Sequence, residues 1–381
     1  MLPSALERGM WLRTIGRITM KLLFFGATEY DRKSFNEELK DFPEVDITFT
    51  KTNLTWRTAI MAQGYDAVCA FVNANINAMA VEILAGLGVK HILMRCAGFD
   101  AVDHVMAKSL GLTVTNVPAY SPEAIAEHAM AIGQTANRRI HKGYIRVREN
   151  DFSLDGLVGE TLIGKTAGII GTGRIGAALC KICKGYGMKV VGADLGPNKG
   201  LVDAGIVDEY VPVYNADGDM VYDEKANCLI EGVGFADRRV SYDPLYAQAD
   251  FISLHAFLNK DSYHMIDEDS VAKMKDGVIF VNTGRGGLVD TMAIIHGVKS
   301  GKFGAVGLDV YEEENENVYR NRSGELVDSI TARLCSFPNV VVTSHQAFFT
   351  KQALAEIARV TLTNAVAKER GIDYVERSVV C

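Results

Sequence analysis

The sequence predicts an α/β protein with two parallel-sheet domains. From Met20 onward, short apolar runs alternate with helix-length segments, which is the pattern of successive βαβ units. One long helical pattern over residues 121–147 divides this alternation into two parts. The chain has 381 residues, of which 48% are apolar and 23% charged, so it can bury a substantial core and is longer than most single domains.

The first domain is expected over residues 20–119. Its strands are the runs KLLFFGA, DITFTK, AVCAFV, HILMRCA and LTVTNVP, and helical segments such as SFNEELKDF and MAVEILAGLG lie between them. A unit of about a hundred residues is within the usual size range of one domain. We therefore expect a complete parallel sheet here.

The second domain is expected over residues 120–349. It opens with a long helix that has Ser121 as N-cap and Pro122 at its first position, and we expect this helix to act as a rod between the domains. Six strand-like runs follow, AGIIG, KVVGAD, FISLH, GVIFV, AVGLDV and NVVVTSH, which match a doubly wound sheet. The helical tail over 350–381 is expected to fold back on the first domain, which makes that domain discontinuous.

Two segments stand outside this pattern. Residues 214–240 separate two predicted strands by more than a typical connection, and their turn residues and alternation predict a surface hairpin insertion. Residues 1–19 carry three arginines against one acidic residue. We interpret them as an N-terminal extension, with an organellar targeting segment as the alternative.

Composition argues against several classes of protein. The net charge of −7 and the sequence pI of about 5.7 indicate no nucleic-acid partner, and no apolar stretch is long enough to predict a membrane span. Seven cysteines, mostly inside predicted strands and helices, indicate a reducing compartment, which we take to be the cytoplasm. Cys180 and Cys183 have the spacing of a zinc site but no second pair, so we expect them to pack within a helix and expect no metal.

Three predicted strands of the second domain end in residues that can carry chemistry. VIFVNTGRG ends in Arg285, AVGLDVYEEE in Asp309 and Glu314, and VVVTSHQ in His345. Ligands of open α/β sheets bind beyond the carboxyl ends of the strands, so these residues are candidates for one site. A guanidinium can hold a carboxylate through two parallel hydrogen bonds, and an imidazole can supply a proton near neutral pH. This set favours the reduction of a 2-oxo acid.

The run KTAGIIGTGRIG predicts a dinucleotide site. Gly171, Gly173 and Gly176 follow an apolar strand and open a helix, where glycines allow a tight turn and the close approach of a pyrophosphate. The next strand ends in Asp194, whose carboxylate can accept hydrogen bonds from the adenosine ribose and repels a 2′-phosphate. The predicted cofactor is therefore NAD rather than NADP.

These residues match a known family. NTGRGGLVD, GLDVYEEE and TSHQAFFT, together with RCAGFDAVD and VPAYSPEAIAEHA, closely resemble motifs of the D-2-hydroxyacid dehydrogenases, and most of all of their fermentative D-lactate dehydrogenase branch. The resemblance runs from Met20 to about residue 371 and is interrupted only by the 214–240 insertion. It implies two Rossmann-like or flavodoxin-like parallel-sheet domains, a discontinuous substrate domain, and a homodimer or homotetramer.

The resemblance also implies roles for the residues at the strand ends. Arg285 binds the substrate carboxylate, His345 is the acid/base, and Glu314 pairs with His345 and favours its protonated form. Asp309 is expected near the nicotinamide. The implied reaction is reversible hydride transfer between NADH and pyruvate, which gives D-lactate.

The remaining implied contacts line the two sides of the site. The backbone of Ala97 and Gly98, with Tyr120, is expected to complete the carboxylate site from the first domain. The expected cofactor contacts are Gly171, Gly173, Arg174, Ile175, Gly176, Asp194, His255, Asn259, Thr283, Gly284 and Asp309. We expect His128 and His264 to be structural, and Glu312 and Glu313 to be solvated neighbours of Glu314.

One departure and two alternatives stay open. The family usually has proline and threonine where this chain has Phe257 and Asn259, so packing on the adenine side of the cofactor is expected to differ. The nearest alternative is a reductase for hydroxypyruvate, glyoxylate or a branched 2-oxo acid. The other is a non-catalytic, NAD-sensing protein of the corepressor type, since such proteins share this architecture.

Overall fold

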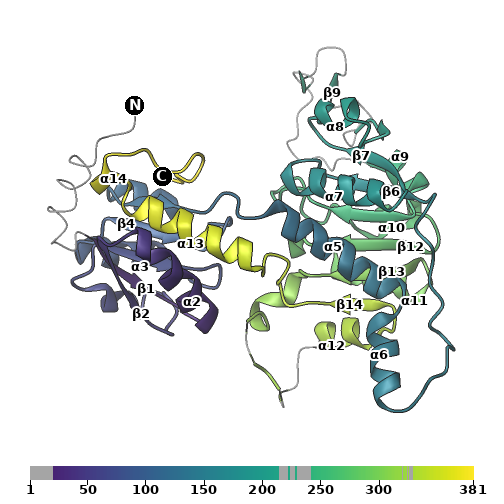
Figure 1. Ribbon diagram of the computed structural model, residues 1–381, viewed down its shortest axis with the longest axis horizontal. Helices are drawn as coiled ribbons and strands as arrows, with labels where there is room; N and C mark the ends of the chain where they lie inside the picture. The colour runs from purple at the N-terminus through teal and green to yellow at the C-terminus, as the bar shows by residue number, and fades with distance from the viewer. Residues whose placement is uncertain are drawn as a thin grey trace, which may run out of the picture. The chain divides into compact units, whose positions relative to one another are not determined.

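The computed structural model describes residues 20–213, 222–223, 228–229, 242–319, 321–323, 325 and 329–381. The chain divides into two compact units: unit 1 holds the chain up to Ser121 together with Phe349–Cys381, and unit 2 is Pro122–Phe348 (Figure 1). The extension over 1–19 and most of the predicted insertion lie outside the described residues. Within the insertion, β9 (Tyr222–Asp223) and β10 (Cys228–Leu229) pair antiparallel, as the predicted hairpin requires.

Unit 1 is built on a parallel sheet of five strands in the order β2-β1-β3-β4-β5. All five runs predicted from the sequence form strands, and every pairing is parallel. The strands are β1 (Met20–Phe24), β2 (Val45–Phe49), β3 (Ala67–Ala70), β4 (His91–Met94) and β5 (Thr113–Thr115). Strands β3 and β4 are buried along their whole length, which explains their unbroken apolar runs.

The helices of unit 1 begin at capping residues. Helix α2 (Glu29–Glu38) starts five residues before the predicted segment SFNEELKDF, because Thr28 and Asp31 form a reciprocal capping box. Asn77 and Asp103 cap α3 (Ala78–Gly86) and α4 (His104–Ser109) by accepting one backbone hydrogen bond each through their side chains. Short 3₁₀ turns at Leu39–Asp41 and Ala59–Ala62 complete the connections.

The C-terminal segment completes unit 1. Helix α13 (Lys351–Ala365) and helix α14 (Ala367–Arg370) follow a Thr350 cap, and in Figure 1 the yellow α13 lies beside the purple α2. Ala358 and Leu362 of α13 are fully buried in one core with Leu22 and Phe24 of β1. Unit 1 is therefore built from both ends of the chain.

Unit 2 contains a parallel sheet of seven strands in the order β14-β13-β12-β11-β6-β7-β8. The strands are β6 (Thr166–Ile170), β7 (Lys189–Ala193), β8 (Glu209–Tyr210), β11 (Phe251–Leu254), β12 (Val278–Asn282), β13 (Phe303–Leu308) and β14 (Val340–Val342). The six predicted strands are present. Strand β8 was not predicted, because two residues are too short to show an apolar period.

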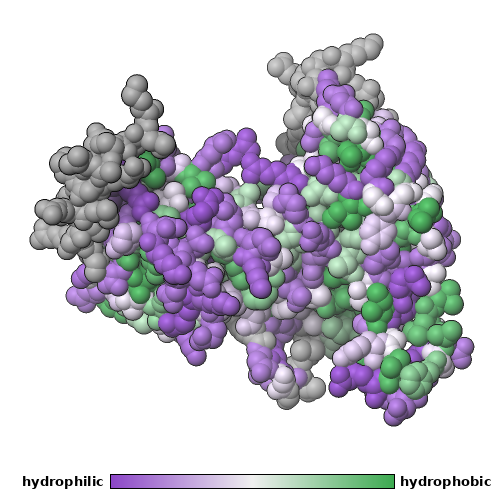
Figure 2. Space-filling model, in the orientation of Figure 1, coloured by the Kyte–Doolittle hydropathy of each residue, from purple (hydrophilic) through white to green (hydrophobic). Residues whose placement is uncertain are grey.

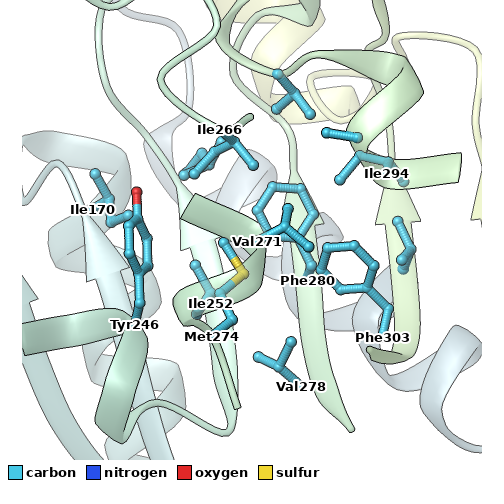
Figure 3. Close-up of a cluster of buried hydrophobic side chains, with 14 of the residues drawn as sticks. Ile170, Tyr246, Ile252, Ile266, Val271, Met274, Val278, Phe280, Ile294 and Phe303 are labelled. Carbon is cyan, nitrogen blue, oxygen red and sulfur yellow. The ribbon is translucent and has the colours of Figure 1, made fainter. Parts of the chain in front are cut away.

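Helices cover both faces of this sheet. On one face, α5 (Pro122–Asn137), α7 (Arg174–Gly185) and α8 (Lys199–Asp203) contribute to a single core. Figure 3 shows the core of the other face, where Phe280 of the sheet lies near Val271 and Ile294, and Ile170 of the sheet lies beside Tyr246. The helix side chains among these are Tyr246, Val271 and Ile294. These side chains come from α9 (Asp243–Gln248), α10 (Glu268–Lys273) and α11 (Thr291–Lys299), and α12 (Ser329–Ser336) adds Leu334. The unit is doubly wound.

The prediction of one long helix after Ser121 was wrong in two respects. It is two helices, α5 and α6 (Ile140–Arg148), separated by Arg139 with φ +52°. The Arg139 guanidinium donates to the carbonyls of Ala136 and Asn137 and so ends α5. Helix α5 is also no rod between domains, because it packs on the sheet of unit 2. Apolar side chains gather over α6 and the segment after it (Figure 2).

The cysteine pair packs inside α7, as the sequence predicts. Cys180 and Cys183 are fully buried, and burial raises the pKa of the Cys180 thiol to about 12. Among the described residues, no group of three or more histidines, cysteines and acids could hold a metal ion. No helix in that part of the chain is both long and apolar enough to cross a membrane. The cytoplasmic location stays a prediction.

A buried histidine in unit 1 makes its stability sensitive to acid. Burial, with a smaller effect of the Lys368 ammonium, lowers the pKa of His91 from 6.5 to about 3. Between these two values the unfolded chain binds the proton and the folded chain does not, so lowering the pH below 6.5 favours unfolding. At about pH 5 the expected loss of stability is about 2 kcal/mol relative to neutral pH.

This loss can be measured by denaturant unfolding near pH 7 and near pH 5. The His91→Gln variant lacks the titrating ring, so its stability should fall by about 2 kcal/mol less than that of the wild type over this interval. An equal fall in both proteins would show that His91 does not contribute to the acid sensitivity.

Candidate active site

The turn between β6 and α7 admits only glycine at two positions. Gly171 has φ +86°, and a Cβ there would lie 2.6 Å from the carbonyl oxygen of His255. A Cβ at Gly176 would overlap the Gly171 carbonyl. Gly173 is the N-cap of α7 and faces open space, so in the described part of the chain no side chain caps the start of this helix, at Arg174 and Ile175. Such a turn can accept a phosphate group.

Asp194 follows β7 beside this turn, and neighbouring groups hold its carboxylate in place. The Thr172 hydroxyl donates to Asp194 Oδ2 at 3.0 Å, and the Gly196 amide donates to Oδ1 at 3.0 Å. The Tyr210 hydroxyl in turn donates to Thr172 Oγ1 at 2.9 Å. Sequence reasoning missed Thr172 and Tyr210. A fixed carboxylate at this point suits a ribose with two free hydroxyls.

The residues expected to line the cofactor groove have different surroundings in the structure. Thr283 Oγ1 is buried and has no hydrogen-bond partner among the described residues. Burial lowers the pKa of His255 to about 4, so its ring is neutral at pH 7. Asn259 Oδ1 accepts the amides of Asp261 and Ser262 at 2.9 Å, so this side chain shapes its own loop and its contact with a cofactor stays a prediction. The orphaned hydroxyl of Thr283 and the open glycine turn fit a bound dinucleotide.

Arg285 follows β12 in a glycine-rich loop. Asn282 organises this loop, since its Nδ2 donates to the Arg285 carbonyl at 3.0 Å and its Oδ1 accepts the Gly284 amide at 3.0 Å. Gly286 lies against the backbone of Tyr311, and a Cβ at position 286 would overlap that backbone. No carboxylate of the described residues lies within ion-pair distance of the guanidinium, whose Nη1 donates to the Gly284 carbonyl at 2.8 Å. The guanidinium can therefore receive an external acid.

Glu314 and His345 form an imidazole–carboxylate pair. His345 Nδ1 lies 3.2 Å from Glu314 Oε1, and the two side chains are 25% and 12% exposed. Glu314 Oε2 is buried without a described partner. His345 has φ +51°, and the Tyr319 hydroxyl donates to its carbonyl oxygen at 3.0 Å. With Nδ1 directed to the acid, Nε2 is the ring atom left for proton transfer.

Asp309 anchors the histidine loop, Thr343–Ala347. Its carboxylate accepts hydrogen bonds from the Thr343 hydroxyl at 2.5 Å, the Gln346 amide at 2.9 Å and the Ala347 amide at 2.8 Å. The His345 amide donates to the backbone carbonyl oxygen of Asp309 at 2.9 Å. Although burial alone would raise the pKa of Asp309, these bonds and His128 lower it. The predicted place of Asp309 near the nicotinamide stays a prediction.

His128, which was predicted to be structural, and Glu312, which was predicted to be solvated, both have specific contacts. His128 on α5 places Nε2 3.3 Å from Asp309 Oδ1 and so braces the anchor, which fits a structural role. Glu312 was wrongly predicted to be solvated: it is 21% exposed, and its Oε1 lies 2.6 Å from His264 Nε2. Although burial alone would raise the pKa of Glu312, hydrogen bonds with His264 and the Thr291 amide lower it.

Unit 1 presents the turn predicted to bind the substrate carboxylate. The Ala97 carbonyl accepts from Asn116 Nδ2 at 2.7 Å, and the Gly98 carbonyl accepts from Cys96 Sγ at 3.1 Å. No described residue accepts from the amides of Ala97 and Gly98, so both can donate to an anion. Tyr120 is half-buried in the same unit, and its contact with substrate stays a prediction.

The glycine turn fits a dinucleotide, and a paired imidazole after β14 can move a proton. Arg285, Glu314 and His345 follow the adjacent strands β12, β13 and β14, whose carboxyl ends lie at one edge of the sheet. Together these features define a nicotinamide-dependent oxidoreductase. The family described as D-isomer specific 2-hydroxyacid dehydrogenase, NAD binding domain, matches residues 130–213 and 220–347. The chain belongs to this family and uses NAD.

Individual relatives agree with this assignment. A 2-hydroxyacid dehydrogenase A of Aspergillus oryzae is 43% identical over 91% of this chain and 91% of its own. The apo structure of D-lactate dehydrogenase from Escherichia coli matches with a TM-score of 0.79 at 39% identity, covering 95% of this chain and 100% of that one. D-lactate dehydrogenase with NAD⁺ from Lactobacillus jensenii matches with a TM-score of 0.75 at 29% identity, with 95% and 100% covered.

Proposed function

We propose that this 2-hydroxyacid dehydrogenase is an NAD-dependent D-lactate dehydrogenase, which interconverts pyruvate and D-lactate. The observation that carries the proposal is the His345–Glu314 pair at 3.2 Å, which follows strands β13 and β14. Arg285, which has no carboxylate partner in the described chain, follows the adjacent strand β12. The HQAFFT and YEEE versions of the two motifs favour lactate, and D-lactate dehydrogenases are among the relatives at about 40% identity.

The contacts described above support a role for each residue in this reaction. When bound along the glycine turn, NADH supplies the hydride. Arg285 holds the substrate carboxylate through parallel hydrogen bonds. His345 donates its Nε2 proton to the carbonyl oxygen as negative charge develops there, and in the reverse direction it accepts the hydroxyl proton. Glu314 fixes the ring orientation and stabilises the imidazolium.

The substrate assignment is tested by NADH oxidation with a panel of 2-oxo acids. Pyruvate should give the highest kcat/KM, ahead of hydroxypyruvate, glyoxylate and 2-oxoisocaproate. In the reverse direction, the enzyme should oxidise only the D enantiomer of lactate. A preference of tenfold or more for a larger acid would assign the chain to another branch of the family. Absence of turnover with every acid would favour the non-catalytic, corepressor-type alternative.

The Glu314→Gln variant tests the imidazole–carboxylate pair. Loss of the negative charge disfavours the imidazolium that donates the proton, so the pH optimum of pyruvate reduction should move to lower pH. Turnover near neutral pH should fall by about tenfold or more. Steady-state rates across the pH range measure both effects, and an unchanged profile would remove Glu314 from the proton-transfer machinery.

We also propose that the enzyme is a homo-oligomer joined through α6 and the segment after it. This apolar arm, residues 140–163, exposes Phe152 by 72%, Leu154 by 79%, Val158 by 84% and Ile163 by 75%. In Figure 2 such side chains gather over α6 and its following segment. Apolar patches of this kind mark protein interfaces, and the family resemblance favours a second copy of the chain as the occupant.

Light scattering of the Val158→Glu variant tests this interface. A charge buried in the interface at this position should convert the oligomer to monomer at micromolar concentration. Val105, which is 70% exposed in unit 1 outside the arm, provides the matched control, and Val105→Glu should leave the mass unchanged. An unchanged mass for Val158→Glu would place the interface elsewhere.

A further inference from the structure

A second imidazole–carboxylate pair lies beside the Arg285 loop. His264 Nε2 is 2.6 Å from Glu312 Oε1, and the Tyr263 hydroxyl donates to the same oxygen at 3.2 Å. Glu312 Oε2 accepts from the amide of Thr291 at 3.2 Å and from its hydroxyl at 3.3 Å. We call these four residues, Tyr263, His264, Thr291 and Glu312, the Glu312 clasp.

The clasp joins three loops at the carboxyl edge of the sheet. Tyr263 and His264 lie in the loop after β11, and Glu312 shares a 3₁₀ turn with Glu314 after β13. Thr291 is the first residue of α11, directly after the loop that follows β12 and carries Arg285. The His264 amide also donates to the Gly287 carbonyl at 2.9 Å. The clasp therefore fixes how the Arg285 loop lies against the turn that carries Glu314.

The Arg285 loop needs such an external constraint. Gly284, Gly286 and Gly287 surround the arginine, and glycines leave a loop with many accessible conformations. The guanidinium donates to the Gly284 carbonyl and has no described carboxylate partner. A carboxylate bonded directly to the guanidinium would compete with the substrate acid. A carboxylate that holds the loop through other residues leaves the guanidinium available.

We propose that Glu312 and His264 are positioning residues that hold Arg285 for the substrate carboxylate. This inference rests on the proposed role of Arg285. Neither residue need touch the substrate or the cofactor. The clasp acts by restricting the Arg285 loop before binding, so its loss weakens binding of the acid and leaves binding of NADH largely unchanged.

The experiment measures the dissociation constant of oxamate, an inert mimic of pyruvate, for the protein–NADH complex by calorimetry. Glu312→Gln and His264→Asn should each weaken oxamate binding by about tenfold, while the dissociation constant of NADH changes by less than about twofold. Asparagine tolerates the left-handed backbone of His264, at φ +51°, but its shorter side chain cannot reach Glu312. This variant thus removes the hydrogen bond without adding backbone strain.

A double-mutant cycle shows whether the clasp acts through Arg285. In an Arg285→Lys background, where the two-pronged contact is already lost, Glu312→Gln should cause no further loss of oxamate affinity. If the losses of oxamate binding free energy in the two single variants add in full in the double variant, the inference is overturned. The matched control is the His296–Glu268 pair, which has a contact of similar length, 2.7 Å, but whose side chains are more than half exposed. Glu268→Gln and His296→Asn should leave oxamate binding unchanged.

The other outcomes separate this inference from the proposed function. Oxamate binding requires no turnover, so a wild type that binds oxamate yet reduces no 2-oxo acid would refute the proposed function while the cycle still decides the role of the clasp. Equal losses of oxamate and NADH affinity would show a general loosening of unit 2 and overturn the inference. A wild type that does not bind oxamate would overturn both.

Discussion

The active-site loop of unit 2 depends on the buried carboxylate of Asp309. A buried charge is costly unless hydrogen bonds satisfy it, and here a hydroxyl and two backbone amides from Thr343–Ala347 do so. Without the acid, each of those donors would lack a hydrogen-bond partner, which would destabilise the fold by about 1–3 kcal/mol for each donor. The carboxylate and the loop therefore hold each other in place, and the backbone of His345 is fixed from both sides by Asp309 and Tyr319.

Much of this arrangement can be predicted from the sequence. The buried strands are unbroken apolar runs, and the residues that follow parallel strands share one edge of the sheet. Arg285, Glu314 and His345 could therefore be assigned to neighbouring strand ends, and the structure brings Glu314 and His345 into contact. The glycines at 171 and 176 were predictable for the same kind of reason, because close backbone approach requires them.

The contacts that hold these residues could not be predicted in this way. Periodicity shows which face of an element is buried, but it does not show which polar side chains from separate loops will meet. For this reason Thr172, Tyr210 and Tyr319 gave no signal, and Glu312 could not be distinguished from its acidic neighbours. The break at Arg139 was missed because helical periodicity continues through it, and only the left-handed backbone of that residue reveals the end of α5.

The division of unit 1 between the two ends of the chain has a consequence for biosynthesis. Ala358 and Leu362 belong to the same core as β1, and the last residue, Cys381, accepts a hydrogen bond from the Val114 amide. A ribosome delivers unit 2 in full before it delivers the segment Phe349–Cys381, so the apolar surface of the nascent N-terminal sheet stays uncovered until that segment has been synthesised. During that interval the growing polypeptide is a substrate for chaperones, and an early stop codon that removes only the tail would leave a folded nucleotide domain attached to an unfinished one.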